Sequence, residues 1–315
     1  MNHTRPGLLD AAAQGIARHR DLAPTLQRLC GEPAQENWLS SHAPIESGSE
    51  GLLQWRCDGR WLYASMEVDE PADGDLAGVV RGAYLDLFAC LRRSGYIHPL
   101  RLWNYLPHIN AEQAGLERYR HFNAGRQQAF LEAGHAAFEG APAACALGSH
   151  HGPFCLRVLA ARSPAVPIEN PRQVSAYHYP AQYGPRAPSF SRAVLADAGD
   201  GQLLLLVSGT ASIVGHATLH AGDVQAQLQE TLRNLRAVID GAARRGATGL
   251  RLEDLRPTVY VRHAADAPAL REALQRALGA EAPLLRHALF LEADICRADL
   301  LVEIEAWARC EGQLR

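Results

Sequence analysis

Two carboxylates stand two residues apart in the apolar run LLVEIEAWA near the end of the chain, at Glu303 and Glu305. If this run is a β-strand, its alternation places Val302, Ile304 and Ala306 on one face and both glutamates on the other. The apolar face must pack against helices, so each glutamate needs a partner, contact with water or a chemical task. Either both glutamates point to water from a half-exposed sheet, or the strand holds a functional carboxyl group. The pattern alone favours neither.

The chemistry open to such a glutamate depends on its surroundings. Apolar and aromatic neighbours disfavour the charged form and raise the pKa of a carboxyl group, which keeps it protonated near neutral pH as a proton donor. Glu303 fits this role on an inward-facing strand, and Glu305, one step along the same face, ranks second.

Arginines are the natural holders of an anionic substrate, because a guanidinium donates two parallel hydrogen bonds to one carboxylate. The candidates are Arg126 in FNAGR, Arg186 in YGPRAPSF and Arg192 shortly after it. Each is equally compatible with a solvated surface arginine. Arg186 is favoured, because the Gly-Pro-Arg-Ala-Pro stretch fixes its backbone at low entropic cost.

Smaller polar groups complete the set of candidates. Tyr177 and Tyr183 offer hydroxyls to a substrate or pack their loop onto the core, and Asn123 is a further polar candidate. The segment SGTAS, which contains Gly209, follows a buried strand and offers backbone N–H groups that hold an anion. A plain glycine turn explains the same segment.

The elements that must position these residues are clearest in the C-terminal half. Apolar periodicity predicts strands over 203–207, 258–262 and 300–308, with helices over 223–243 and 266–278. This order predicts helices packed on one face of a mixed sheet. Upstream we expect strands over 52–57, 61–68 and 99–105, helices over 76–94 and 112–134, a long functional loop over 164–191 and a turn region over 208–216. No internal repeat is visible.

Composition excludes several classes of protein. The chain has 315 residues and a formal net charge of −3, so no basic face indicates nucleic-acid binding. No run of about 18 apolar residues predicts a membrane span, and the first residues do not resemble a signal peptide. Seven scattered cysteines without a CxxC pair indicate reduced thiols in a cytoplasmic protein.

Several blocks of the sequence resemble known families. The helix from Asp223, the TVYV strand with the helix after it, and the closing EIEA strand follow the order of the RidA/YjgF superfamily over about the last hundred residues. Over about residues 95–310 the chain resembles the chorismatases, whose fold is related to RidA. The blocks that carry this resemblance are RLWNYLPHIN (101–110), RYRHFNAGRQQAF (118–130), SAYHYPAQYGPRAPSFSRA (175–193), SGTASIVGHAT (208–218) and ADICRADLLVEIEA (293–306).

The resemblance implies a fold, a reaction and a set of residues. The fold is of the α/β (α+β) class, with an N-terminal α/β region over 1–145 and a RidA/YjgF-like domain over 146–315 that contributes most of the active site. The reaction is the protonation of the enolpyruvyl ether of chorismate by Glu303, with release of pyruvate. Cys296 and Gly209 match the subtype that forms 3-hydroxybenzoate, while a related subtype also releases 4-hydroxybenzoate. Cys296 then shapes the pocket or assists the chemistry.

The same resemblance implies no cofactor and no metal, and chorismate as the small-molecule partner. RidA relatives are trimers with clefts between subunits, so the chain is expected as a monomer or a trimer, with a site within one chain favoured. Two other functions stay open, a RidA-type enamine/imine deaminase and a non-catalytic sensor of aromatic carboxylates. Imine deamination is disfavoured, because Ala288 stands near the place where RidA deaminases carry an arginine.

Overall fold

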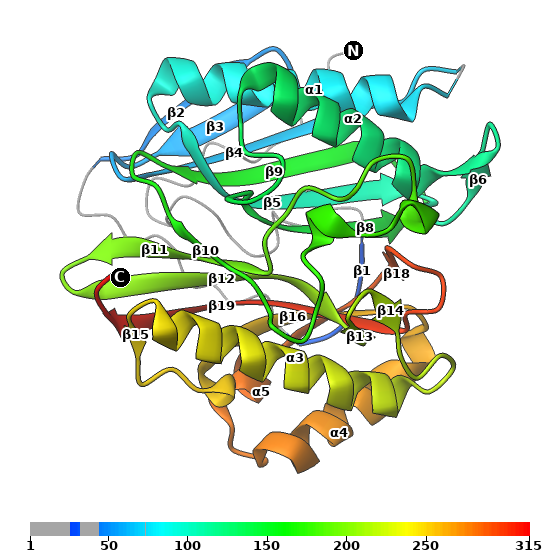
Figure 1. Ribbon diagram of the computed structural model, residues 1–315, viewed down its shortest axis with the longest axis vertical. Coiled ribbons are helices and arrows are strands. Elements are labelled where there is room, and N and C mark those ends of the chain that lie inside the picture. The colour runs from blue at the N-terminus through cyan, green and yellow to red at the C-terminus, as the bar shows by residue number, and fades with distance from the viewer. Residues whose placement is uncertain (1–25, 32–43, 73) are drawn as a thin grey trace, which may run out of the picture.

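The computed structural model describes residues 26–31, 44–72 and 74–315. These residues form two lobes, each built from one mixed β-sheet with α-helices on its outer face (Figure 1). The two sheets face each other, so the layers follow in the order helices, sheet, sheet, helices. The expected α/β class, with mixed sheets and helices packed on one face of each, is confirmed.

The N-terminal lobe contains a seven-stranded sheet that is covered by α1 (Leu76–Ser94) and α2 (Arg118–Ala133). Strands β5 and β8 run parallel, and the other neighbours in the sheet are antiparallel. In spatial order the strands are β18 (Asp294–Ile295), β8 (Ala143–Ser149), β5 (His98–Pro107), β9 (Phe154–Ala161), β4 (Trp61–Val68), β3 (Leu53–Cys57) and β2 (Glu46–Glu50).

The C-terminal lobe repeats this plan with α3 (Val224–Arg244), α4 (Ala267–Leu278) and the short α5 (Pro283–His287) on its outer face. Here β16 and β17 are the parallel pair. In spatial order the strands are β1 (Gln27–Cys30), β17 (Leu289–Glu292), β16 (Arg256–Val261), β19 (Val302–Gly312), β12 (Gln202–Ala211), β11 (Ala193–Gly199) and β10 (Val166–Ile168), and β15 (Ala247–Thr248) also pairs with β19.

The two lobes share one chain topology, which the sequence did not reveal. In each lobe a run of antiparallel strands leads to a helix, a strand, a second helix and a parallel strand. The closing strand then inserts between two earlier strands, β9 between β4 and β5, and β19 between β12 and β16. The lobes also exchange edge strands, because β18 joins the N-terminal sheet beside β8 and β1 joins the C-terminal sheet beside β17. The chain is therefore a duplicated fold.

Helices form where caps and apolar spacing coincide. The Asp75 side chain accepts a hydrogen bond from the Gly78 N–H at 2.8 Å, which caps the start of α1. Gly95, in the left-handed conformation with φ of 77°, ends the helix. Between them Val80, Ala83 and other buried residues recur at helical spacing and face the sheet. The helix predicted over 76–94 is confirmed.

Two predicted boundaries were wrong. The helix expected from residue 112 begins only at Arg118, because Ala114 (φ 50°) and Gly115 (φ 76°) make a left-handed turn between β6 (Glu112–Gln113) and β7 (Leu116–Glu117). The turn region expected over 208–216 starts instead as the end of β12, and a small hairpin of β13 (Ile213–Val214) and β14 (Ala217–Thr218) follows it. The loop expected over 164–191 is irregular apart from β10 and two short 3₁₀ turns.

The strands on either side of residue 145 bear on where the two lobes divide. Residues 145 and 146 both lie inside β8, and the N-terminal sheet continues through β9 to Ala161. The next strand, β10, already belongs to the C-terminal sheet. We therefore propose that the lobes divide at about residues 162–165, and that the site described below draws on both of them.

The contact between the two sheets is mostly apolar but contains a polar centre. Trp103 and Trp307 are buried there, and the hydroxyls of Tyr105 and Tyr260 lie 3.1 Å apart across the lobes. This contact fixes how the closing strand β19 faces the N-terminal lobe. Within the described ranges, no helix has the length and hydropathy needed to cross a membrane.

Candidate active site

A cavity of about 360 Å³ lies between the lobes at the start of β19. The N-terminal lobe contributes Tyr119 and Arg120 from the first turn of α2. The C-terminal lobe contributes the loop that ends at Arg192, the end of β12 and the loop before β19. Five of the residues predicted from the sequence line this one cavity: Glu303, Cys296, Gly209, Arg192 and Tyr183.

Glu303 is the buried acid of the cavity, whose described lining also contains the less buried Glu117 and Asp299. It is the second residue of β19, opposite Ala211 and Tyr260 in the two neighbouring strands, and only 4% of it is exposed. Burial raises the pKa of its carboxyl group to about 8, and the negative charge of Glu305 acts in the same direction against the smaller opposing effect of Arg101 and Arg192. Glu303 is therefore protonated at neutral pH.

Glu305 lies on the same inward face but has a different environment. It forms an ion pair with Arg101 of β5, and both side chains are buried. The Trp103 Nε1–H donates to the other carboxylate oxygen at 3.2 Å. The two glutamates therefore do not point to water. Glu305 is held in this ion pair beside Glu303, whereas Glu303 has no ion-pair partner among the described residues.

Gly209 makes room for the acid. The pairing of β12 with β19 shifts register between Val207 and Thr210, so that Ser208 and Gly209 form a β-bulge. A Cβ atom at position 209 would lie 1.9 Å from Oε1 of Glu303 and 3.3 Å from Cβ of Cys145. Any side chain here would displace the carboxyl group. Glycine is required by this close approach.

Two arginines face the cavity with nitrogens that are not fully used. Arg192 donates from Nη2 to the Val174 carbonyl at 2.8 Å and to the Tyr179 hydroxyl at 2.9 Å, while its buried Nε has no partner among the described residues. Arg297 donates from Nη1 to the His216 carbonyl at 2.9 Å, and in the described part of the chain its buried Nη2 is likewise unpaired. Two cations are thus available for anionic groups of a ligand.

Tyrosine rings hold these arginines in place. The Arg297 guanidinium lies 4.1 Å from the ring centroid of Tyr183 and 5.2 Å from that of Tyr179. The Tyr183 hydroxyl donates to the His216 carbonyl at 2.7 Å. The Tyr183 hydroxyl is therefore already engaged, and its predicted contact with a substrate stays a prediction.

Cys296 lies in the wall of the cavity, seven residues before Glu303. Burial raises the pKa of its thiol to about 12, and the nearby Glu303 acts in the same direction. The thiol is therefore neutral at physiological pH. A neutral thiol is a weak nucleophile and a weak donor, so the environment of Cys296 favours a part in the shape of the cavity.

The structure places four predicted residues outside the cavity lining. Arg186 is exposed and its Nη1 donates to Gln127 at 3.4 Å, so the rigid backbone on which its prediction rested directs it towards α2. Tyr177 packs against His178, with ring centroids 4.7 Å apart. Arg126 and Asn123 are buried within α2, where Arg126 Nη2 donates to Asn123 Oδ1 at 3.1 Å. Arg126 Nε and Asn123 Nδ2 have no partner among the described residues, and the parts predicted for these four residues stay predictions.

Sequence reasoning missed Arg297 and gave Tyr179 no preference. Arg297 was visible beside Cys296 in the ADICRAD block, but no local pattern separated it from other arginines. Its place follows from β18, which attaches the preceding residues to the sheet of the other lobe. Tyr179 was one of three tyrosines in its loop, and its contact with Arg192 depends on how that loop folds.

Comparison with known proteins gives consistent matches over most of the chain. Residues 36–160 match the family described as chorismatase FkbO/Hyg5-like, N-terminal. A 3-hydroxybenzoate synthase of Streptomyces hygroscopicus is 41% identical over 295 residues, which cover 90% of this chain and 82% of that protein. A chorismatase of Streptomyces rapamycinicus is 40% identical over 282 residues, covering 87% and 82%. A crystal structure of a chorismatase at 1.08 Å resolution matches with a TM-score of 0.76 and 36% identity, covering 84% of this chain and 79% of that one.

Proposed function

This chain belongs to the chorismatase family, and we propose that it converts chorismate into 3-hydroxybenzoate and pyruvate with Glu303 as the proton donor. The observation that carries the proposal is a buried carboxyl group with its pKa raised to about 8, in a cavity whose lining also contains Arg120, Arg192 and Arg297. An acid that stays protonated at neutral pH is what the cleavage of an enol ether requires.

The reaction can be followed at the level of protons and bonds. Glu303 gives its proton to the terminal methylene of the enolpyruvyl group, which makes the ether carbon electrophilic and weakens the bond between the ether oxygen and the ring. The C4 hydroxyl of the substrate displaces that oxygen, pyruvate leaves, and the hydroxyl proton returns to the Glu303 carboxylate. In the resulting arene oxide one carbon–oxygen bond breaks, the ring carbon that keeps the oxygen loses its proton, and the oxygen gains a proton to give the aromatic acid. The atoms of chorismate equal those of the two products, with no net oxidation.

The arginines have a separate task. Chorismate carries two carboxylates, and Arg192 and Arg297 each offer a cationic group to the cavity. We assign one carboxylate to each arginine, because a guanidinium binds a carboxylate with more directional hydrogen bonds than a single point charge does. The tyrosine rings beside them exclude water and so strengthen these contacts.

The choice of product rests on Cys296 and Gly209. Both residues match the 3-hydroxybenzoate-forming subtype and both line the cavity beside Glu303. The relative that is 41% identical is named for the same product. The neutral thiol of Cys296 supports a role for this residue in shaping the cavity around the C4 hydroxyl. Because a related subtype also forms 4-hydroxybenzoate, this second product should be measured as well.

The oligomeric state and the cellular location are proposed from the cavity and from the cysteines. Both lobes of the chain line the cavity, and we propose that the site is complete within one chain. Each of the seven cysteines is unpaired, which supports a reducing compartment and a cytoplasmic location. Size-exclusion chromatography with light scattering would distinguish a monomer from a trimer.

The decisive experiment incubates the purified protein with chorismate and separates the products by chromatography. We expect equal amounts of pyruvate and hydroxybenzoate, with 3-hydroxybenzoate in excess. Glu303→Gln should reduce kcat by at least about 10³, in the range typical of a lost general acid, and leave the fold intact. Glu311→Gln, exposed at the far end of the same strand, is the matched control and should keep full activity.

Two other outcomes would point to the rival functions. Release of ammonia from a 2-aminoacrylate substrate would favour an enamine/imine deaminase. Binding of chorismate or of an aromatic carboxylate without any pyruvate formed would favour a sensor. Retained pyruvate release by Glu303→Gln would remove Glu303 from the mechanism.

A further inference from the structure

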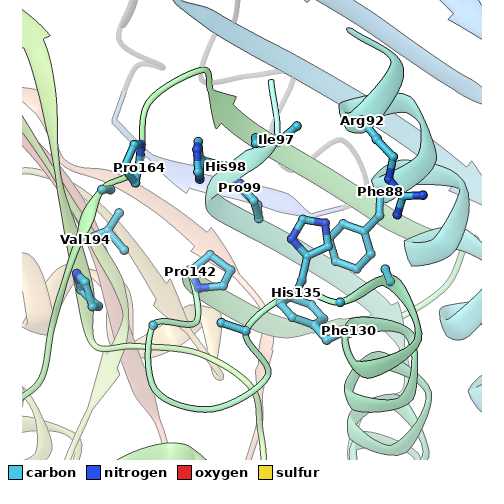
Figure 2. Close-up of a pocket in the computed structure, with 16 residues that line it drawn as sticks. Phe88, Arg92, Ile97, His98, Pro99, Phe130, His135, Pro142, Pro164 and Val194 are labelled. Atoms are coloured by element: carbon cyan, nitrogen blue, oxygen red, sulfur yellow. The ribbon is translucent and has the colours of Figure 1, made fainter. Parts of the chain in front are cut away.

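A second cavity, of about 500 Å³, lies between the lobes and apart from the cavity of Glu303. The N-terminal lobe lines it with the ends of α1 and α2 and the start of β5, and the C-terminal lobe with Pro164, Pro167 and Val194 (Figure 2). Among the described residues, none lines both cavities. Its volume lies in the range of small-molecule sites.

The charged groups of this cavity are all basic. Arg92, His98 and His135 line it, and the described lining contains no aspartate or glutamate. In the described ranges Arg92 has no ion-pair partner, whereas the adjacent Arg93 is paired with Glu50. Burial lowers the pKa of His135, and the positive charges of Arg92 and His98 add to this effect. Such a group of basic side chains without a counter-charge favours an anion.

One wall of the cavity is aromatic and rigid. The rings of His135 and Phe88 are stacked, with centroids 4.1 Å apart and an interplanar angle of 30°. Phe130 meets Phe88 edge-on at 4.9 Å, which supports this stack from behind. Figure 2 shows the stack facing His98, Pro164 and Val194 across the cavity. Phe88 and Phe130 are buried, so His135 is the partly exposed ring of this group that is available to a planar ligand.

Helix ends do not oppose an anion strongly here. α1 and α2 both end at this cavity, and the C-terminal end of a helix carries partial negative charge. However, the Tyr96 N–H donates to the Leu91 carbonyl at 3.1 Å, and the His135 N–H donates to the Phe130 carbonyl at 2.9 Å. These terminal carbonyls are therefore already hydrogen-bonded.

We propose that this cavity binds a planar aromatic monocarboxylate, with the carboxylate among Arg92, His98 and His135 and the ring on the Phe88–His135 stack. The site is separate from the proposed chemistry at Glu303, so either proposal can fail without the other. Benzoate is the simplest member of the ligand class. Hydroxybenzoates, the products of the proposed reaction, belong to it as well.

The location of the ligand is tested with 3-bromobenzoate soaked into crystals of the full chain. The anomalous signal of bromine marks every site directly. We expect one peak between His98 and His135, in addition to any peak near Glu303. A peak near Glu303 alone, or on the surface alone, would overturn the proposal.

The affinity is tested by calorimetry with benzoate and two variants of adjacent residues. Arg92→Gln should weaken the site by about tenfold or more, since a charged donor to the carboxylate is lost. Arg93→Gln removes the same charge from the next residue, which does not line the cavity, and should change affinity less than twofold. Equal effects of the two variants would contradict a specific site.

Two further probes separate charge from shape. Benzamide keeps the ring and lacks the charge, so it should bind at least about tenfold more weakly than benzoate. Cyclohexanecarboxylate keeps the charge and lacks the flat ring, so it should also bind more weakly. His135→Phe keeps the stack but removes the ionisable group, and thermal melting verifies that each variant is folded. Benzamide binding as tightly as benzoate would overturn the assignment of a carboxylate.

Discussion

The two lobes have the same topology but differ at the residues that carry chemistry. In the C-terminal lobe Tyr260 pairs with Glu303 of the closing strand, and in the N-terminal lobe Tyr105 pairs with Cys155. Cys155 therefore occupies the position that corresponds to Glu303. It is fully buried, and its thiol lies 3.6 Å from the Pro153 carbonyl. The two lobes share the scaffold, and at this pair of matched positions the C-terminal lobe alone holds an acid.

The strand beside the acid differs as well. β4 pairs with β9 without interruption from Trp61 to Val68, while β12 contains the bulge at Gly209. The bulge provides the space that the Glu303 carboxyl group occupies. A regular sheet would have no room for a buried carboxyl group at this place. The position of the acid therefore depends on the bulge.

A matched pair of arginines shows how the lobes divide their tasks. Arg101 and Arg256 stand at corresponding positions, four residues before Tyr105 and Tyr260. Arg101 reaches across the interface to the buried Glu305, whereas Arg256 lies over the ring of Trp307 of its own lobe at 4.9 Å. The N-terminal lobe thus supplies the counter-charge that allows the C-terminal lobe to bury an anion beside the acid.

The largest test changes the matched residues of the two closing strands. Glu303→Cys gives the C-terminal lobe the residue of the N-terminal lobe and should reduce kcat by at least about 10³, because the proton donor is lost. Cys155→Ser at the corresponding position should leave kcat within about twofold and slightly reduce stability. Chorismate turnover measures both. A similar loss in the two variants would mean that both lobes take part in the chemistry.

The second test compares the matched arginines by urea unfolding. Arg101→Met leaves Glu305 buried without its ion partner and should cost about 3–5 kcal/mol of the free energy of unfolding. Arg256→Met removes a stacking contact at a half-buried site and should cost about 1 kcal/mol. Replacing Glu305 by Gln in the Arg101→Met variant should recover part of the loss. Equal costs at positions 101 and 256 would contradict the division of tasks between the lobes.

The third test uses the pH dependence of kcat/KM to distinguish the acid of the C-terminal lobe from the cysteine at the matched position of the N-terminal lobe. The donor must carry its proton, and the pKa of Glu303 is about 8, so kcat/KM should be level below that pH and fall about tenfold per pH unit above it. Cys155→Ser should keep this profile. Glu305→Gln removes a negative charge that raises the pKa of Glu303, so its decline should begin at lower pH.

Stability should depend on pH through the same group. The pKa of Glu303 is raised from its ordinary value of 4.5 to about 8, so the folded state binds this proton more tightly than the unfolded state. This contribution is fully present below pH 4.5 and is lost as pH rises through 8. The melting temperature of Glu303→Gln should therefore rise relative to the original protein between these pH values. A constant difference would mean that the carboxyl group is not held neutral.

The residues around the acid show what could be read from the sequence. Strand alternation placed Glu303 and Glu305 on one face, and the structure buries both there. Alternation is a local property of the chain, so it survives folding. The ion pair of Glu305 with Arg101 joins residues 204 positions apart, and no local pattern indicates such a partner. For Arg186 a local property was not sufficient. The rigid backbone around it does not determine where its side chain points, and this side chain donates to Gln127.

The sequence did not reveal that the two lobes share one topology, and the reason is physical. A buried strand or helix needs only apolar residues at the right spacing, and many sequences satisfy this need. Trp103 and Asn104 in β5 stand where Thr258 and Val259 stand in β16, with different side chains in the same sheet order. The topology is therefore conserved where the residues are not. The sequence predicted the elements of the C-terminal lobe, and the relation between the lobes required the structure.

The smallest test concerns the point where the two lobes are most alike. Tyr105 and Tyr260 occupy corresponding positions, both are fully buried, and burial raises the pKa of each phenol well above its ordinary value. Each neutral hydroxyl has the other as its partner at 3.1 Å, so removing one leaves the other unpaired. Tyr105→Phe and Tyr260→Phe should each cost about 1–2 kcal/mol of the free energy of unfolding, and the double variant less than the sum. Additive losses would mean that the two hydroxyls act independently, and that this contact does not join the lobes.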